Sequence, residues 1–114
     1  MFIDFLLDVF EEHRQDDALV WRGAASTYAR LLALIHASGG ELEQEGIEPG
    51  TVVLLDADFS PAGVAMLLAL IERGCIIVPI TRAASGKEGQ YREIAEVEAI
   101  IRVDAADRVR YEFT

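Results

Sequence analysis

Two acidic residues follow the first strongly apolar segment of the chain, and they are the leading candidates for chemistry. Asp56 and Asp58 come directly after Thr51–Leu55, Thr81 follows the next apolar segment, and Lys87 is the only lysine of the sequence. Open α/β sheets bind ligands beyond the carboxyl ends of their strands. Carboxylates, a hydroxyl and a lysine at that edge could form a Mg²⁺ site or accept a phosphoryl group.

The same residues also fit a purely structural role. Aspartate is common in turns, so Asp56 and Asp58 could be a solvated turn that follows a strand. A phospho-accepting receiver domain has its acidic pair after its first strand and its lysine after its last strand, and this chain has neither arrangement. A receiver-like acceptor is therefore the least favoured of three functional hypotheses.

The remaining reactive side chains indicate neither a metal site nor a nucleophile. His13 and His36 have no partner at helical spacing, so we expect His13 at a helix end and His36 exposed on a helix. Cys75, the only cysteine, opens an apolar strand and is expected to be an inert core thiol. Ser60 is expected to cap a helix. We therefore assign no catalytic, cofactor-binding or metal-ligating residue.

Phosphate-binding glycine loops are also absent from the sequence. After Leu55 the first glycine is Gly63, too late for a dinucleotide fingerprint, and Ser85-Gly86-Lys87 lacks the earlier glycine of a Walker loop.

Composition and charge limit the possible partners. The chain has 114 residues, of which 52% are hydrophobic, and its formal net charge is −10. That charge argues against nucleic-acid binding and against docking on anionic membranes. The longest apolar run, Val64–Ile71, is too short to span a bilayer, and no signal peptide is recognisable. We expect a soluble, cytoplasmic protein.

The first half of the chain predicts two helices and a small hairpin that precede the candidate residues. The spacing of Phe2, Phe5, Leu6, Val9 and Phe10 predicts a helix that docks on the core through that face. Further along we expect the following elements: strands Asp17–Trp21 and Ala25–Ser26, then a helix Tyr28–Gln44 capped by Thr27, ended at Gly46 and weak or closely packed at Ser38-Gly39-Gly40.

The second half predicts alternating strands and helices. In chain order we expect the following: a buried strand Thr51–Asp56, a helix from Ser60-Pro61 to Arg73 ended by Gly74, a second buried strand Cys75–Ile80, a polar loop Thr81–Gly89, a helix Gln90–Val97, a strand Ala99–Val103 and an edge strand Arg108–Phe113. This order predicts one α/β domain over residues 1–114, with a mainly parallel sheet and flanking helices.

Several of these segments, in order, resemble AMP-forming acyl-CoA synthetases. These enzymes belong to the adenylate-forming superfamily, with the luciferases and the adenylation domains of nonribosomal peptide synthesis. The turn and strand of Gly46–Leu55 are similar to that family's glycine-x-x-proline-glycine motif. The similarity spans residues 2 to 103 and includes four further segments: Ala18–Gly23, Ser26–Leu32, Leu67–Ile80 and Glu93–Val103.

The chain also departs from the family pattern. Arg30 and Thr51 stand where the family usually has acids, Asp58 stands where it usually has asparagine, and Gly39-Gly40 is atypical. The family's lysine-closed phosphate loop and its later catalytic residues have no counterpart here, so no catalytic residue is carried over.

The resemblance implies an N-terminal scaffold fragment of a larger ligase. The full enzyme would adenylate a carboxylic acid, such as a fatty acid, with ATP and Mg²⁺ and then form a thioester, usually with coenzyme A. The fragment alone would be inactive, and its partner would be the rest of the synthetase chain. A free-standing interaction or regulatory module is the alternative. Val109, Tyr111 and Phe113 on an unpaired edge also predict self-association as a two-fold dimer.

Overall fold

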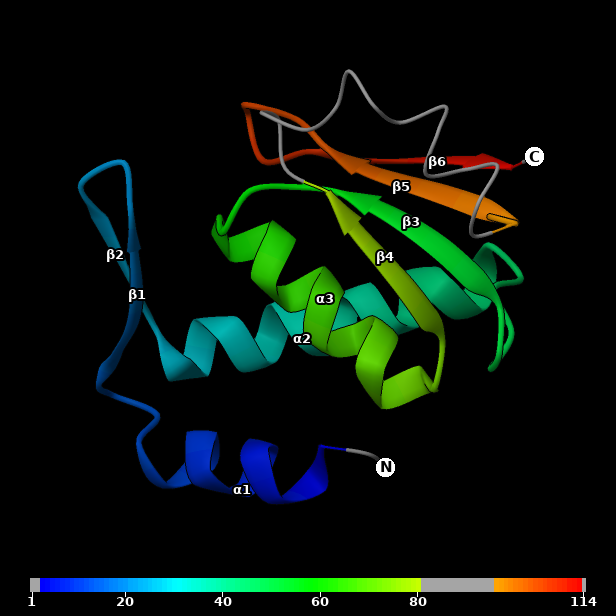
Figure 1. Cartoon of the computed structure of the whole chain (residues 1–114). Helices are drawn as coiled ribbons and strands as arrows, with labels where there is room; N and C mark the ends of the chain where they lie inside the picture. Colours follow the sequence, from blue (N-terminus) through cyan, green and yellow to red (C-terminus); the bar gives the residue numbers. More distant parts are fainter. Residues whose placement is uncertain (1–2, 81–95, 114) are drawn as a thin grey trace.

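A computed structural model describes residues 3–80 and 96–113 of the chain, which form three helices, a small hairpin and a larger sheet (Figure 1). In chain order the elements are α1 (Asp4–Glu12), β1 (Asp17–Trp21), β2 (Ala24–Thr27), α2 (Tyr28–Gln44), β3 (Val52–Asp56), α3 (Pro61–Arg73), β4 (Ile76–Ile80), β5 (Ala99–Val103) and β6 (Val109–Phe113). The expected loop 81–89, with Thr81 and Lys87, lies outside the described residues.

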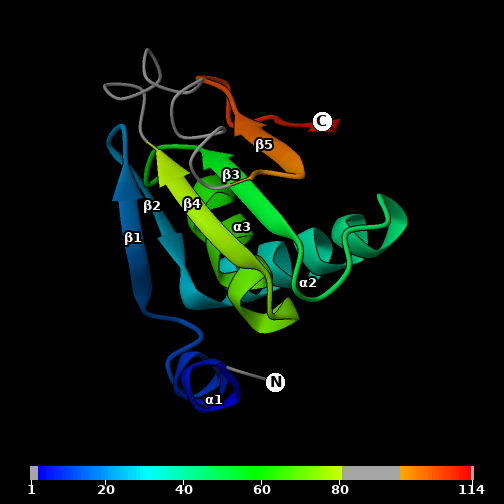
Figure 2. The same cartoon turned by 45° about the vertical axis from the view of Figure 1, so that its right-hand side comes forward.

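The larger sheet has the order β4-β3-β5-β6, in which β4, β3 and β5 are parallel and β6 is antiparallel to β5. Helices α2 and α3 pack against each other on one face of this sheet, and the hairpin β1-β2 stands beside it (Figure 2). The prediction of a mainly parallel α/β fold with a small N-terminal hairpin is confirmed.

The core lies between the sheet and the helices. Val53, Leu55 and Ile101 pack toward the helices against Met66 and Leu70. Leu54 and Ile100 alternate with them and pack with Ile80 and Val97 in a second cluster. Strands β3 and β5 are therefore buried on both faces, as the apolar runs in the sequence predict.

Strand β4 differs from its prediction as a second buried strand. It is an edge strand of the described sheet, and only Ile80 is fully buried, whereas Ile76 is 57% exposed. Pro79 fits this place because proline has no N–H to donate to a further strand. Hydrophobicity along a strand reports side-chain type, and it does not distinguish an edge position from a central one.

The predicted helix ends are confirmed at atomic level. Thr27 Oγ1 accepts from Arg30 N at 3.2 Å, and Ser60 Oγ accepts from Gly63 N at 3.1 Å. At the C-terminal ends, Gly46 and Gly74 have φ of +77° and +81°, a conformation that glycine adopts without strain.

Helix α2 runs without a break through Gly39 and Gly40. A Cβ atom added at either glycine would meet nothing within 4 Å. Of the two expectations, a weak or a closely packed centre, close packing therefore does not hold at the glycines. The two glycines sit in open space on a regular helix.

Helix α1 lies where it is expected, and its packed side combines Phe10 of the predicted face with Leu7 from outside that face. Leu7 and Phe10 pack toward the core, and the Phe10 ring lies 4.9 Å from that of Tyr28. Phe5 and Val9 of the predicted face instead point to solvent, with 72% and 46% of their surfaces exposed. Because hydrophobic residues lie on both sides of this helix, periodicity alone did not show which side packs.

Two expectations near the C-terminus also change. The expected helix Gln90–Val97 falls mostly outside the described residues, and its last two residues are not helical, with Glu96 at φ +52°. On β6, Val109 and Tyr111 pack against the core, so of the proposed apolar edge patch only Phe113 is mostly exposed, at 56%.

Candidate functional site

The carboxyl ends of β3 and β4 are the place where the sequence suggested chemistry. Asp56 closes β3, and its Oδ2 accepts from Arg102 Nη1 on β5 at 2.9 Å. Both side chains are largely buried, at 17% and 22% exposure, and Arg102 also bonds Glu112 on β6. Asp56 is thus committed to an ion-pair network across three strands, which is a structural role.

Asp58 lies in a different environment from Asp56. It borders a small cavity of about 260 Å³, whose walls are mostly apolar and come from the end of β3, the start of α3 and the end of β4. Residues lining it include Leu55, Phe59, Val64, Leu67 and Pro79. This cavity suits an apolar group more than a phosphate.

The acid–hydroxyl–lysine site is not assembled in the described part of the chain. Thr81 and Lys87 lie outside it, and Asp56 is engaged by Arg102. Within residues 3–80 and 96–113, no three side chains of His, Cys, Asp or Glu are grouped so that they could hold a metal ion. The predicted site therefore stays a prediction, because two of its residues lie outside the described ranges.

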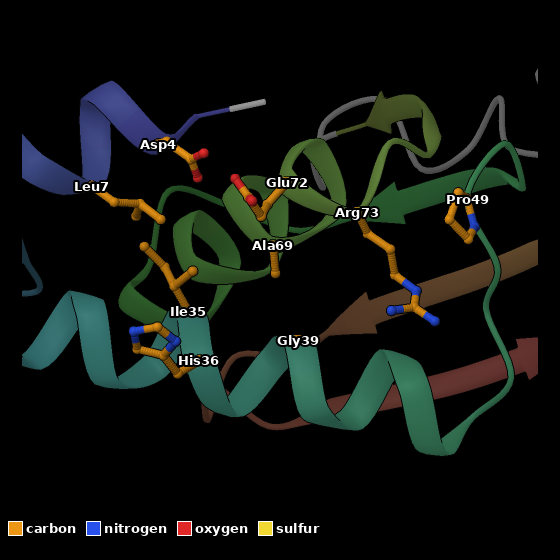
Figure 3. Close-up of a pocket in the computed structure, with 9 residues that line it drawn as sticks. All are labelled: Asp4, Leu7, Ile35, His36, Gly39, Pro49, Ala69, Glu72 and Arg73. Atoms are coloured by element: carbon orange, nitrogen blue, oxygen red, sulfur yellow. The ribbon is translucent and has the colours of Figure 1, made fainter. Parts of the chain in front are cut away.

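A larger cavity of about 510 Å³ lies among the three helices (Figure 3). Leu7, Ile35, Gly39 and Ala69 give it apolar walls, and Asp4, His36, Glu72 and Arg73 place charged or polar groups around them. Glu72 Oε2 accepts from the backbone N of Ile3 at 3.1 Å, so it ties the start of α1 to α3. Arg73 Nε donates to the carbonyl of Ile47. Glu72 and Arg73 therefore link α3 to the segments before α1 and before β3, beside an apolar cavity.

The two histidines lie where their sequence context predicts, whereas Cys75 is only partly buried and precedes the edge strand β4. His13 is the C-terminal cap residue of α1, with Nδ1 3.0 Å from Asp16 Oδ2, and His36 is exposed on α2. Burial raises the pKa of the Cys75 thiol and outweighs the nearby Arg73, which lowers it. Little reactive thiolate is expected at neutral pH.

Two structural roles were not predicted from the sequence. Arg102 is the partner of Asp56, and Asp107 Oδ2 accepts from Ala62 N in the first turn of α3 at 3.1 Å. Both contacts join residues 45 or 46 positions apart. Such pairs depend on the tertiary fold, and no local signal in the sequence announces them.

Several solved structures share this fold. An artificially fused adenylation-PCP di-domain, NpsA-ThdA from Klebsiella oxytoca, superposes with a TM-score of 0.76 at 22% identity, over 90% of this chain and 20% of that one. The NpsA N-terminal subdomain from the same organism gives 0.75 at 23% identity, over 88% and 28%. VinN gives 0.80 at 20% identity, over 94% and 29%.

These likenesses concern the fold, and this chain spans between a fifth and a third of the length of those proteins. No curated protein sequence matches the chain significantly. None of the helices in the described ranges is both long and apolar enough to cross a bilayer. The family model described as AMP-binding enzyme matches residues 7–110. The chain therefore belongs to the AMP-binding enzyme family.

Proposed function

We propose that this chain is the N-terminal scaffold part of an adenylate-forming acid ligase. The observation that carries the proposal is the family match over residues 7–110, which coincides with the hairpin, the parallel sheet and helices α2 and α3. Two of the solved neighbours are NpsA proteins, one of them an adenylation di-domain and the other an N-terminal subdomain.

In the proposed full enzyme, a carboxylic acid and ATP·Mg²⁺ give an acyl-adenylate and pyrophosphate. A thiol, coenzyme A in an acyl-CoA synthetase, then takes the acyl group. Adenylation is needed because a carboxylate is a poor electrophile, and AMP is a good leaving group. We propose that the rest of the full enzyme carries the nucleotide site and the catalytic residues.

The contribution of this chain is then architectural. The Asp56–Arg102–Glu112 network fixes three strands at the carboxyl edge of the sheet, where a ligand site of an α/β protein is built. The capped start of α3 and the apolar cavity beside Asp58 lie at the same edge. This edge is therefore the wall that we expect to face the rest of the enzyme.

The proposal is tested by measuring pyrophosphate release with ATP, Mg²⁺ and a panel of carboxylic acids. The native full-length polypeptide is expected to release pyrophosphate with at least one acid, and the 114-residue chain to show only background. Turnover by the 114-residue chain alone would contradict the scaffold assignment. A native polypeptide that is active with none of the acids would favour the interaction module instead.

A further inference from the structure

Helix α1 carries an apolar surface that the described fold leaves uncovered. Its inward side is used by Leu7 and Phe10, and no residue of the helix is fully buried. Phe5 and Val9 lie one helical turn apart on the opposite side and are 72% and 46% exposed. Two large neighbouring apolar side chains on one outer stripe form a small apolar patch that a partner could cover.

The charges around this stripe all have one sign. Helix α1 contains Asp4, Asp8, Glu11 and Glu12 and no basic residue. Asp8 follows Phe5 by three positions and Glu12 follows Val9 by three, so each acid borders one of the exposed apolar residues. Glu11 is bonded to Arg14, with Nη1 2.7 Å from Oε2, and lies further round the helix. The surface is thus an apolar stripe with acidic residues along one side.

This charge pattern favours one kind of binding partner over two others. A two-fold contact with a second copy would place Asp8 and Glu12 against the same acids of the other chain, which is unfavourable. Anionic lipid surfaces would also repel these acids, since interfacial helices need basic residues in their place. A partner with basic residues around an apolar stripe would satisfy both parts of the surface.

We propose that the α1 outer face, formed by Phe5 and Val9 and bordered by Asp8 and Glu12, docks a basic amphipathic helix of a partner protein. Apolar side chains of that helix at positions i and i+4 cover Phe5 and Val9, and flanking Lys or Arg residues pair with the acids. Docking at this face does not require adenylating activity, so either proposal can be wrong without affecting the other.

The test uses a synthetic helical peptide of about 14 residues, made of Leu on one face and Lys on the other, with binding followed by fluorescence anisotropy. Phe5→Ser combined with Val9→Ser is expected to weaken binding by about tenfold. Asp8→Asn combined with Glu12→Gln should weaken it about threefold and reduce its salt dependence. Phe113→Ser, at an exposed apolar residue on β6, is the matched control and should leave binding unchanged. Circular dichroism checks that each variant is folded.

Control probes separate specific docking from general attraction to an acidic chain. A scrambled peptide of the same composition should bind at least about tenfold more weakly, because it lacks the apolar stripe. Equal affinity of the wild type and the Phe5→Ser, Val9→Ser variant would overturn the proposal. So would binding to phosphatidylserine vesicles, or self-association, that these two substitutions abolish.

Discussion

Tyr111 on β6 buries its hydroxyl group with no hydrogen-bond partner among the described residues. Burial is the main reason that the pKa of this phenol is raised, and the carboxylates of Glu41 and Glu45 add to the effect. The folded state therefore favours the neutral phenol. An unsatisfied buried hydroxyl is also a cost to stability, which its removal would relieve.

Tyr111→Phe is expected to raise the free energy of unfolding at pH 7 by about 1 kcal/mol. The wild type should also lose stability as the pH rises above about 10, the ordinary tyrosine pKa, because the unfolded chain ionises there and the folded chain resists ionisation. Tyr111→Phe should lose less over that range. Urea denaturation at pH 7 and pH 10.5 measures both effects, and a variant less stable than wild type at pH 7 would show that the hydroxyl has a partner.

Gly63 marks a close approach between α3 and the preceding turn. A Cβ atom at this position would lie 2.2 Å from the backbone oxygen of Asp58, so the turn before α3 would have to shift. Gly63→Ala is therefore expected to destabilise the fold by about 2 kcal/mol, despite the better helix propensity of alanine. Thermal unfolding measures the loss. A melting temperature equal to that of wild type would mean that the turn yields easily.

At the scale of elements, helix α2 carries a weakness that packing does not explain. Gly39 and Gly40 lie in its interior, and a Cβ at either would meet open space. Each glycine costs a helix about 1 kcal/mol relative to alanine. The helix persists because its ends are capped and because Leu31, Ile35 and Leu42 are buried in the core.

Gly39→Ala is therefore expected to raise the free energy of unfolding by about 1 kcal/mol, and Gly40→Ala by a similar amount. The same chemical change at Gly63 should have the opposite sign, so the three variants form a matched set. Chemical denaturation of each gives the comparison. A loss of stability in Gly39→Ala would contradict the open environment seen beside the helical cavity.

The sequence predicts those features of the helices and strands that depend on residues close together along the chain. The caps at Thr27 and Ser60 and the glycines at Gly46 and Gly74 are local, and all four were predicted correctly. The docking side of α1 and the edge position of β4 depend on what lies across space. The side of α1 was predicted only in part, through Phe10, and the position of β4 was predicted wrongly.

In the candidate site, too, local features were predicted and long-range contacts were not. Asp56 and Asp58 were correctly expected at the carboxyl edge of the sheet, because strand order places them there. The ion pair of Asp56 with Arg102 was not predictable from the sequence. Arg102 lies 46 residues from Asp56 and becomes its neighbour only because β3 pairs with β5.

At the scale of the whole molecule, the described surface retains apolar side chains at widely separated places. They occur on α1, on the hairpin, in the turn after β3 and on both edge strands of the sheet: Phe5, Val9, Val20, Phe59, Ile76 and Phe113. A chain that is one part of a larger enzyme would use some of these surfaces against the remainder of that enzyme.

Self-association of the isolated chain through the β6 edge stays a prediction. Val109 and Tyr111 are engaged in the core, so Phe113 is the residue to test. The wild type is expected to dimerise at high concentration, and Phe113→Lys should sediment as a monomer because it places a charge in that contact. If the wild type sediments as a monomer at every concentration, the prediction of a dimer is wrong.

We propose that this chain supplies the scaffold of a longer adenylate-forming enzyme. The most direct test is the mass of the native polypeptide, measured by immunoblot of source-cell lysate with an antibody raised against residues 3–80. We expect a band several times heavier than 12.5 kDa, since the chain spans only 20% to 29% of the length of the similar solved proteins. A single band near 12.5 kDa would contradict it and would mean that the cell makes this domain alone, as an interaction or regulatory module.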